Sequence, residues 1–459
     1  MRLAIAISLQ SSLNARTIIE HAAWAASDRL LDRPSGARYT SANPEKQAFQ
    51  RGQLDMTVDP KFRNGPLSDL RVIELGTLLA GPFCGQLLGD MGAEVIKIEP
   101  PGQGDPMRNW GREKAHGKSL WWPVIARNKK AVTLDLRQPE GQSLLKELVA
   151  ESDFLLENFR PGTMEKWGLG WDVLSKINPR LIMIRVSGFG QTGPYSRQAG
   201  FGAVGEAMGG LRYVCGDPAT PPSRMGISIG DSLAATFAAV GALSALHYRE
   251  KTGRGQLVDS AIYEAVLNMM ESLITEYDKA GYIRERTGAI LPNVAPSNVY
   301  PTSDGQMVLI AGNQDTVFAR LAEAMGQPEL AKDERFISHM ARGARQQELD
   351  ELIADWTRTK TCKEILALMD NFGVPSGLIY RAPDMLEDPH FKARDAIVST
   401  KHPDFGDLRM QNVAPKLSET PGGIRSPSPG MGEHNDNVYL DLLGLSRERY
   451  EILKANKVI

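Results

Sequence analysis

The fold is decided by residues 70–99, which read LRVIELGTLLAGPFCGQLLGDMGAEVIKIE. The apolar run Leu70–Leu75 predicts a buried strand, and Glu94–Glu99 predicts a second one. Between them, Ala80-Gly81-Pro82 offers a glycine for a tight turn and a proline for the first turn of a helix. Residues 83–91 carry apolar side chains at helical spacing. A strand, a helix and a strand in this order predict two parallel strands joined by a right-handed crossover.

The same alternation continues to about residue 280 and predicts a doubly wound, Rossmann-like α/β domain. Further strands are expected at residues 131–136, 153–159, 180–190 and 257–262, and helices at 139–150, at 232–247 and from the last strand to about 280. Beyond Tyr282 we expect a smaller α+β domain, with a strand at 307–312 and helices at 315–325, 345–356 and 362–371. The predicted divisions are 56–285 for the large α/β domain, 286–385 for the small domain, and 386–459 for a C-terminal segment that returns to the large domain.

The first 55 residues form a separate N-terminal extension. Residues 1–19 contain arginines and no acidic residue, which is compatible with a mitochondrial presequence. The alternative is a disordered extension, or an artefact of the assigned translation start, with Met56 as the functional start. We favour the alternative, so the expected location is the cytoplasm, with the mitochondrial matrix as the second choice.

Composition excludes several classes of protein. The chain has 459 residues, of which 42% are hydrophobic and 24% charged, with a formal net charge of -2. This is typical of a soluble protein with more than one domain, and it does not predict binding to nucleic acid or to a membrane. Three scattered cysteines without a C-x-x-C pair argue against a disulfide framework and a structural zinc site.

Two motifs suggest chemistry. Residues 188–193, GFGQTG, fit the dinucleotide-binding pattern, but no helix signal follows at once, so a tight loop is the better interpretation. No pair of histidines has metal-ligand spacing. Asp231 follows the apolar stretch 225–230 and opens an alanine-rich helix, where it is either an N-cap or an anion placed at free N–H donors.

From about Pro66 onward, the chain resembles the class III CoA-transferase family, which includes formyl-CoA, carnitine-type and succinyl-CoA-dependent transferases. The resemblance rests on the order and spacing of several segments. They are GAEVIKIEPPGQGD (92–105), RNKKAVTLDL (127–136), ENFRPG (157–162), SGFGQTGP (187–194), GDSLAAT (230–236) and KTGRGQ (251–256). Leu79 replaces a glutamine of the formyl-CoA branch, and residues 290–301 lack its glycine-rich flap, so the dicarboxylate-using branch is the closer match.

The resemblance implies roles for particular residues. It makes Asp231 the covalent nucleophile and implies an aspartyl anhydride and an aspartyl-CoA thioester as intermediates. The implied CoA contacts are Leu78, Leu79, Ala80, Leu134, Arg137, Asn158, Phe159 and, less securely, Lys166 and Trp167; ordinary core packing is an equal interpretation for Leu78, Leu134 and Phe159. Gly190 and its loop are expected near the substrate, and either Arg212 or Arg224 is expected to bind the far carboxylate of a dicarboxylic acid.

The resemblance also implies substrates and partners. Acyl-CoA, with succinyl-CoA favoured, is the expected donor and a carboxylic acid the acceptor, with no metal and no cofactor beyond CoA. An interlocked homodimer is expected. The rival function is that of an α-methylacyl-CoA racemase, whose segment corresponding to residues 199–210 contains a histidine that is missing here. A CoA-binding protein without turnover is a further rival.

Overall fold

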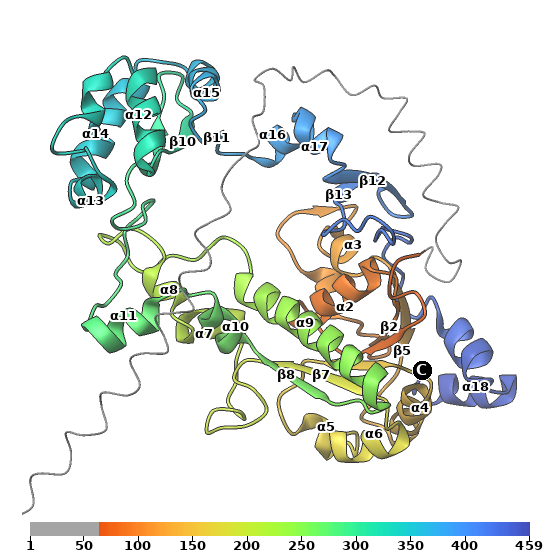
Figure 1. Ribbon diagram of the computed structural model, residues 1–459. Coiled ribbons are helices and arrows are strands. Elements are labelled where there is room, and N and C mark those ends of the chain that lie inside the picture. The colour runs from red at the N-terminus through yellow and green to blue at the C-terminus, as the bar shows by residue number, and fades with distance from the viewer. Residues whose placement is uncertain (1–63) are drawn as a thin grey trace, which may run out of the picture. The chain divides into compact units, whose positions relative to one another are not determined.

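The structure is a computed structural model, and it describes residues 64–459 (Figure 1). The predicted extension at residues 1–55, and with it the question of a presequence, lies outside the described residues.

The main feature is a six-stranded parallel sheet with the strand order β5-β2-β1-β6-β7-β8. Its strands are β1 (Arg71–Glu74), β2 (Glu94–Glu99), β5 (Lys129–Thr133), β6 (Phe154–Glu157), β7 (Ile182–Ser187) and β8 (Leu257–Ala261). Numbered along the chain, these six strands read 3-2-1-4-5-6 across the sheet, which is the order of a doubly wound fold. The prediction of an α/β fold is therefore confirmed, and the strand order reverses between β1 and β6.

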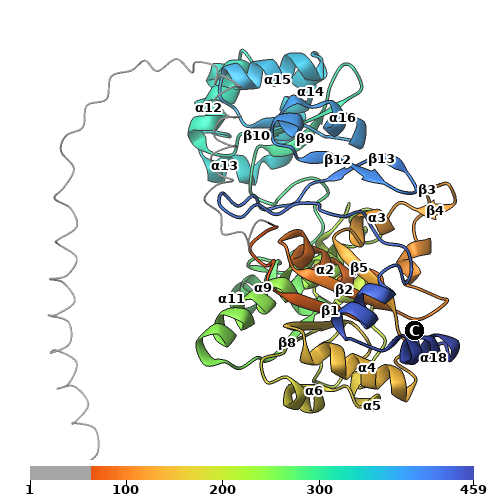
Figure 2. The ribbon, with the colours of Figure 1, turned by 90° about the vertical axis from the view of Figure 1, so that its right-hand side faces the viewer.

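Helices cover both faces of this sheet (Figure 2). The helices in this part of the chain are α2 (Ala80–Asp90), α3 (Trp122–Ile125), α4 (Pro139–Ala150), α5 (Thr163–Lys166), α6 (Trp171–Ile177), α7 (Gly202–Met208), α8 (Leu211–Val214), α9 (Ile229–Thr252), α10 (Ile262–Asn268) and α11 (Leu273–Ala280). Successive strand residues alternate between two cores: Ile73 and Leu155 pack with leucines of α4, whereas Val72 and Phe154 pack with α2 and the alanines of α9.

Several predicted boundaries differ from the structure, and three of them are informative. The strand expected at 131–136 is β5, which ends at Thr133 because its partner β2 ends at Glu99, immediately before two prolines. The helix expected at 232–247 begins three residues earlier and ends five residues later. The long helix expected after β8 is two helices, α10 and α11, because Glu271 between them takes a left-handed backbone conformation (φ 53°) that a helix cannot contain.

A second, three-stranded antiparallel sheet has the order β11-β10-β9. Its strands are β9 (Ser297–Pro301), β10 (Met307–Ala311) and β11 (Ser376–Leu378), and the helices beside them are α12 (Asp315–Ala324), α13 (His339–Ala344), α14 (Gln346–Thr357) and α15 (Cys362–Asn371). These elements share a hydrophobic core of their own between Ala295 and Val374. The domain boundaries that we expect around this region remain predictions.

The C-terminal residues contact the large sheet. They include α16 (Ala382–Glu387), α17 (Pro389–Ala393), the hairpin β12 (Ile397–His402) and β13 (Gly406–Gln411), and α18 (Arg447–Ala455). β5 is an edge strand, and the N–H of Thr133 donates to Asn435 Oδ1 at 2.9 Å while the N–H of His434 donates to the carbonyl of Ala131 at 3.0 Å. Residues 434–435 therefore occupy backbone groups that an edge strand otherwise leaves free.

One helix in the described part of the chain, α9, is long and apolar enough to cross a membrane by length and composition, although we expected no such segment from the sequence. Its alanines at 234, 235, 238 and 242 are fully buried against the sheet. The core helix of a soluble protein passes the same test, so the observation is weak evidence for a membrane span.

Candidate functional site

The reversal of strand order places the ends of β1 and β6 side by side, where ligands bind in sheets of this kind. Thr77 follows β1 and Asn158 follows β6. The N–H of Thr77 donates to Asn158 Oδ1 at 2.8 Å, and Asn158 Nδ2 donates to the carbonyl of Thr77 at 2.9 Å. This reciprocal pair ties the two strand ends together.

The Ala-Gly-Pro turn packs directly on this pair. A Cβ added to Gly76 would lie 3.1 Å from Cα of Gly81, and one added to Gly81 would lie 3.2 Å from Cγ of Asn158. Glycine is thus required for close approach on both sides of the turn. Leu78 between them has a left-handed backbone (φ 62°), which is strained for a leucine, and its N–H donates to Asp105 Oδ1 at 3.1 Å.

Buried charged side chains stabilise the turn between β1 and α2. Lys97 Nζ lies 3.1 Å from Glu74 Oε1 and 2.8 Å from Asp105 Oδ2, and it donates to the carbonyl of Gly76 at 2.7 Å. Burial disfavours the charged form of Lys97, but Glu74 and Asp105 outweigh it and raise the pKa of Lys97. Glu74, Lys97 and Asp105 were not among the predicted site residues. The signal was present in the strand IKIE, which places a lysine between two buried apolar positions.

Asp231 lies in the wall of a cavity of about 440 Å³. The cavity is lined by the β1–α2 turn, Asn158, the end of β7 with Gly188, residues 200–203, and the first turn of α9. Asp231 is the third residue of α9 and is not its N-cap, which is Ser228, so the predicted capping role is wrong. A Cβ added to Gly202 would lie 2.3 Å from Asp231 Oδ2, so the carboxylate rests against bare backbone.

The protonation of Asp231 is shifted by its surroundings. Burial and the nearby carboxylate of Glu206 raise its pKa to about 6, while the guanidinium of Arg224 acts in the opposite direction. Among residues 64–459 no group is recorded as hydrogen-bonding the Asp231 carboxylate. The group is thus a half-desolvated carboxylate that titrates near neutral pH and is open to a reaction partner.

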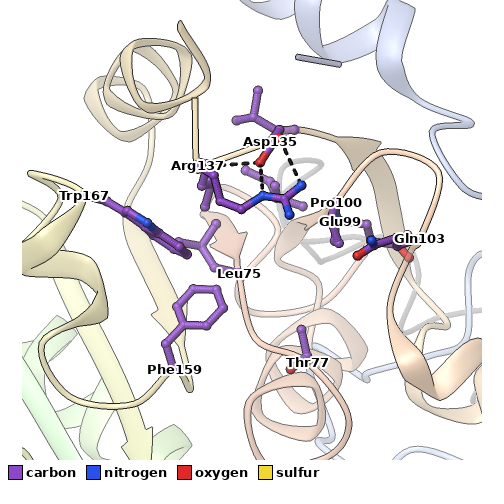
Figure 3. Close-up of a pocket in the computed structure, with 12 residues that line it drawn as sticks. Leu75, Thr77, Glu99, Pro100, Gln103, Asp135, Arg137, Phe159 and Trp167 are labelled. Atoms are coloured by element: carbon purple, nitrogen blue, oxygen red, sulfur yellow. Dashed lines mark hydrogen bonds and ion pairs between the residues drawn. The ribbon is translucent and has the colours of Figure 1, made fainter. Parts of the chain in front are cut away.

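A second, smaller cavity of about 230 Å³ shares Thr77 with the first (Figure 3). Figure 3 shows Trp167 and Phe159 on one side and Gln103 on the other. The rings of Phe159 and Trp167 meet edge to face, with centroids 5.4 Å apart. Arg137 Nε donates to Asp135 Oδ1 at 2.8 Å, and this ion pair raises the pKa of Arg137.

The structure brings most of the predicted site residues to these two cavities. Asp231, Arg224, Leu78, Leu79, Ala80 and Asn158 line the first, and Leu134, Arg137, Phe159 and Trp167 line the second. Lys166 and Gly190 line neither: Lys166 is an exposed residue at the end of α5, and Gly190 is buried in a turn of positive φ beside Asp259. The tight-loop interpretation of residues 188–193 agrees with the structure, since the next helix begins only at Gly202.

Of the two candidate arginines, only one lines the cavity. Arg212 Nε is bound to the buried Glu206 at 2.8 Å and does not line the cavity, whereas Arg224 does. Sequence reasoning missed Glu206, Phe201 and Gly202, although all three lie in the segment inspected for a histidine. No histidine lines the cavity in the described part of the chain. Within residues 64–459, no group of three or more His, Cys, Asp or Glu residues is arranged to hold a metal ion.

Comparison with known proteins identifies the family. The sequence model of "CoA-transferase family III" matches residues 67–435. The chain is 62% identical over 394 residues to a succinyl-CoA–D-citramalate CoA-transferase of Chloroflexus aurantiacus, covering 86% of this chain and 98% of the relative. It is 34% identical to a succinate–glutarate CoA-transferase of Agrobacterium fabrum, covering 85% and 98%.

A solved structure agrees with this result. A CAIB/BAIF family protein from Brucella suis superimposes with a TM-score of 0.74 at 35% identity, covering 83% of this chain and all of that protein. Mixed α/β architecture, the ordered sequence segments and these matches lead to one conclusion. The chain is an enzyme that belongs to CoA-transferase family III.

Proposed function

We propose that this enzyme moves CoA from succinyl-CoA to a second dicarboxylic acid through covalent intermediates on Asp231. The observation that carries the proposal is the half-desolvated Asp231 carboxylate in the cavity wall, with its pKa raised to about 6. At neutral pH the group is mostly ionised, and partial removal of water leaves it more reactive than a free carboxylate.

The reaction balances without any other reactant. An Asp231 oxygen attacks the thioester carbon of succinyl-CoA, the C–S bond breaks, and CoA leaves as the thiolate. The thiolate attacks the Asp231 carbonyl carbon of the mixed anhydride and releases succinate, which leaves an aspartyl-CoA thioester. The acceptor carboxylate attacks that thioester, and the thiolate then attacks the acyl carbon of the acceptor, which restores Asp231. No proton or electron is consumed, so we propose no cofactor beyond CoA.

The two cavities suggest how CoA is held. We expect the ADP portion beside Arg137, whose Nη1 has no recorded partner among residues 64–459, with the adenine against Phe159 or Trp167. The pantetheine arm then passes Thr77, which both cavities share, and brings the sulfur to Asp231. The start of α2, which has no side-chain cap and no acidic residue in its first turn, offers N–H donors to the developing oxyanion.

Dicarboxylic substrates are supported by the relatives and by Arg224. The relatives named above act on citramalate and glutarate, and a 44% identical pair from Chloroflexus aurantiacus are named as subunits of a succinyl-CoA–L-malate CoA-transferase. Arg224 lines the cavity beside Asp231 and is exposed, and within residues 64–459 its side chain makes a single hydrogen bond, to Ser228 Oγ at 3.3 Å. Its guanidinium is therefore available for the far carboxylate of donor and acceptor.

The test combines turnover with trapping. The protein is incubated with succinyl-CoA and a panel of acids, new CoA esters are identified by mass spectrometry, and the reaction is quenched with hydroxylamine to convert an acylated carboxylate into a hydroxamate. We expect the hydroxamate on the peptide that contains Asp231. Asp259→Asn is the matched control, since burial also raises the pKa of Asp259 but the residue lies outside the cavity. Epimerised substrate without CoA exchange, or an active Asp231→Asn enzyme, contradicts the proposal.

We also propose a homodimer. Large hydrophobic side chains are exposed along α9–α11, including Val240, Leu243, Met269, Ile274 and Tyr277. Exposed apolar surface of this extent on consecutive elements is typical of a subunit interface. Light scattering coupled to size exclusion is expected to give twice the chain mass, and a monomer at micromolar concentration contradicts it.

A further inference from the structure

Helix α9, which carries Asp231, packs closely against α7, and each of the two helices has a glycine at the contact. On α7, Gly202 and Glu206 lie one turn apart and face the first turn of α9. A Cβ on Gly202 would collide with the Asp231 carboxylate, and a Cβ on Gly230 would lie 2.9 Å from Glu206 Cγ. The two helices can approach this closely only because both positions lack a side chain.

Glu206 is buried at this contact, with 1% of its surface exposed. Its Oε1 accepts from the N–H of Gly230 at 3.3 Å, and its Oε2 accepts from Arg212 Nε at 2.8 Å. Gly230 directly precedes Asp231, so this hydrogen bond holds the turn that presents the nucleophile. The ion pair with Arg212 gives the Glu206 carboxylate a partner of opposite charge at a place where an unpaired carboxylate would be costly.

We infer that Glu206 is a positioning residue for the transferase reaction: its buried carboxylate holds the first turn of α9 and places a second negative charge beside Asp231. The inference rests on the proposed function of Asp231.

The charges around Asp231 support this role. In the described part of the chain, Glu206 from α7 and Arg224 from the segment before α9 are the charged groups that act on Asp231. Along the contact the order is Arg212, Glu206, Asp231, Arg224, so the two carboxylates are neighbours and an arginine lies on either side of the pair. Glu206 opposes ionisation of Asp231 and so raises its basicity, and a more basic carboxylate attacks a thioester more readily. The same effect lets Asp231 become protonated at a higher pH, so activity should be lost in acid.

The test is the acid limb of the pH profile of kcat/KM. In Glu206→Gln the negative charge is removed while the side-chain shape is kept, and the acid limb is expected to move about one pH unit lower, which raises the ratio of activity at pH 5 to activity at pH 8 by about fivefold. Titration of the substrates affects every variant equally and cancels in comparison with the unmodified enzyme. An unshifted acid limb in an active Glu206→Gln enzyme overturns the inference.

Two further variants separate electrostatics from structure. In Glu206→Gln the side-chain amide N–H group faces the N–H donor of Arg212, which is unfavourable. The double variant Glu206→Gln/Arg212→Gln restores a donor–acceptor pair and is expected to show the same shift of the acid limb. Asp90→Asn removes a buried carboxylate from another ion pair, with Arg127 at 2.6 Å, outside the cavity. It is expected to lower the melting temperature without moving the acid limb. A shift in Asp90→Asn equal to that in Glu206→Gln contradicts a specific role for Glu206.

A measurement that does not depend on turnover distinguishes this inference from the proposed function. Asp231→Asn is made in the unmodified and in the Glu206→Gln background, and the change in melting temperature at pH 8 is compared. If Glu206 opposes the ionised Asp231, the stabilisation by Asp231→Asn is smaller in the Glu206→Gln background. Equal changes in both backgrounds refute the inference, even where Asp231 is the nucleophile. An active Asp231→Asn enzyme refutes the proposed function, even where the coupling is found.

Discussion

Replacing Asp231 by asparagine should stabilise the protein while it abolishes transfer. An aspartate whose pKa is higher in the folded state than in the unfolded chain opposes folding whenever it is ionised. The pKa of Asp231 rises from 3.8 to about 6, because of burial and the neighbouring Glu206. Asparagine has nearly the same shape and carries no charge, so it removes this penalty.

The magnitude follows from the size of the shift. A change of about 2 pKa units corresponds to about 3 kcal/mol at most, and the partial exposure of Asp231 reduces the expected gain to about 1–2 kcal/mol. For a unit of this size, we expect the melting temperature at pH 8 to rise by roughly 1–2 °C. Well below pH 3.8 the carboxyl is protonated in both states, and the two proteins should melt alike. The advantage of the variant should develop between pH 4 and pH 6 and stay constant above pH 7.

The assay is differential scanning calorimetry of both proteins from pH 2 to pH 8. Asp315→Asn serves as the opposite control, since Asp315 also lies in the first turn of a helix but is bound by Arg342, which lowers its pKa. That variant should be less stable than the unmodified protein at pH 8, and the difference should vanish as the pH falls through the folded pKa. An Asp231→Asn protein that is no more stable at pH 8, or whose gain is the same at every pH, refutes the reasoning.

Three other substitutions test the site. Arg224→Gln should raise the KM for dicarboxylic acceptors at least tenfold, about 1.4 kcal/mol of binding, and change monocarboxylic acceptors much less, as measured by initial rates; equal effects on both classes contradict a carboxylate contact. Arg137→Gln should raise the KM for succinyl-CoA several-fold with little change in kcat, and an unchanged KM would remove Arg137 from the phosphate site. Asp105→Asn should cost about 3–5 kcal/mol in urea unfolding because it leaves Lys97 buried without one of its partners, and a loss below 1 kcal/mol argues against that ion pair.

Much of the fold could be predicted from local patterns, because each strand of a parallel sheet is a short apolar run and each crossover helix has its own periodicity. α4 and α15 begin and end at the predicted residues. The start of α9 could not be found in this way, since Ile229 and Gly230 do not favour a helix and are held there by α7 and Glu206. Local preference was overridden by a tertiary contact.

The site was predicted less completely, for a related reason. Family resemblance indicated Asp231 and the residues of the β1–α2 turn, but it also indicated Lys166 and Gly190, which lie outside both cavities. Which side chains converge depends on strand order and on close approaches between helices. Gly202 illustrates this, since nothing in its own neighbourhood of the sequence shows that it faces a carboxylate almost thirty residues later.

The contact of residues 434–435 with the edge strand β5 has a consequence for synthesis of the chain. Asn435 follows Thr133 by 302 residues, and at about 5–20 residues per second a ribosome needs about 15–60 s to make them. During that interval, the nascent large sheet presents an open strand edge to other nascent chains. Expression at high ribosome density, or loss of the last 25 residues, should therefore favour inclusion bodies, even though every residue of both cavities has already been made.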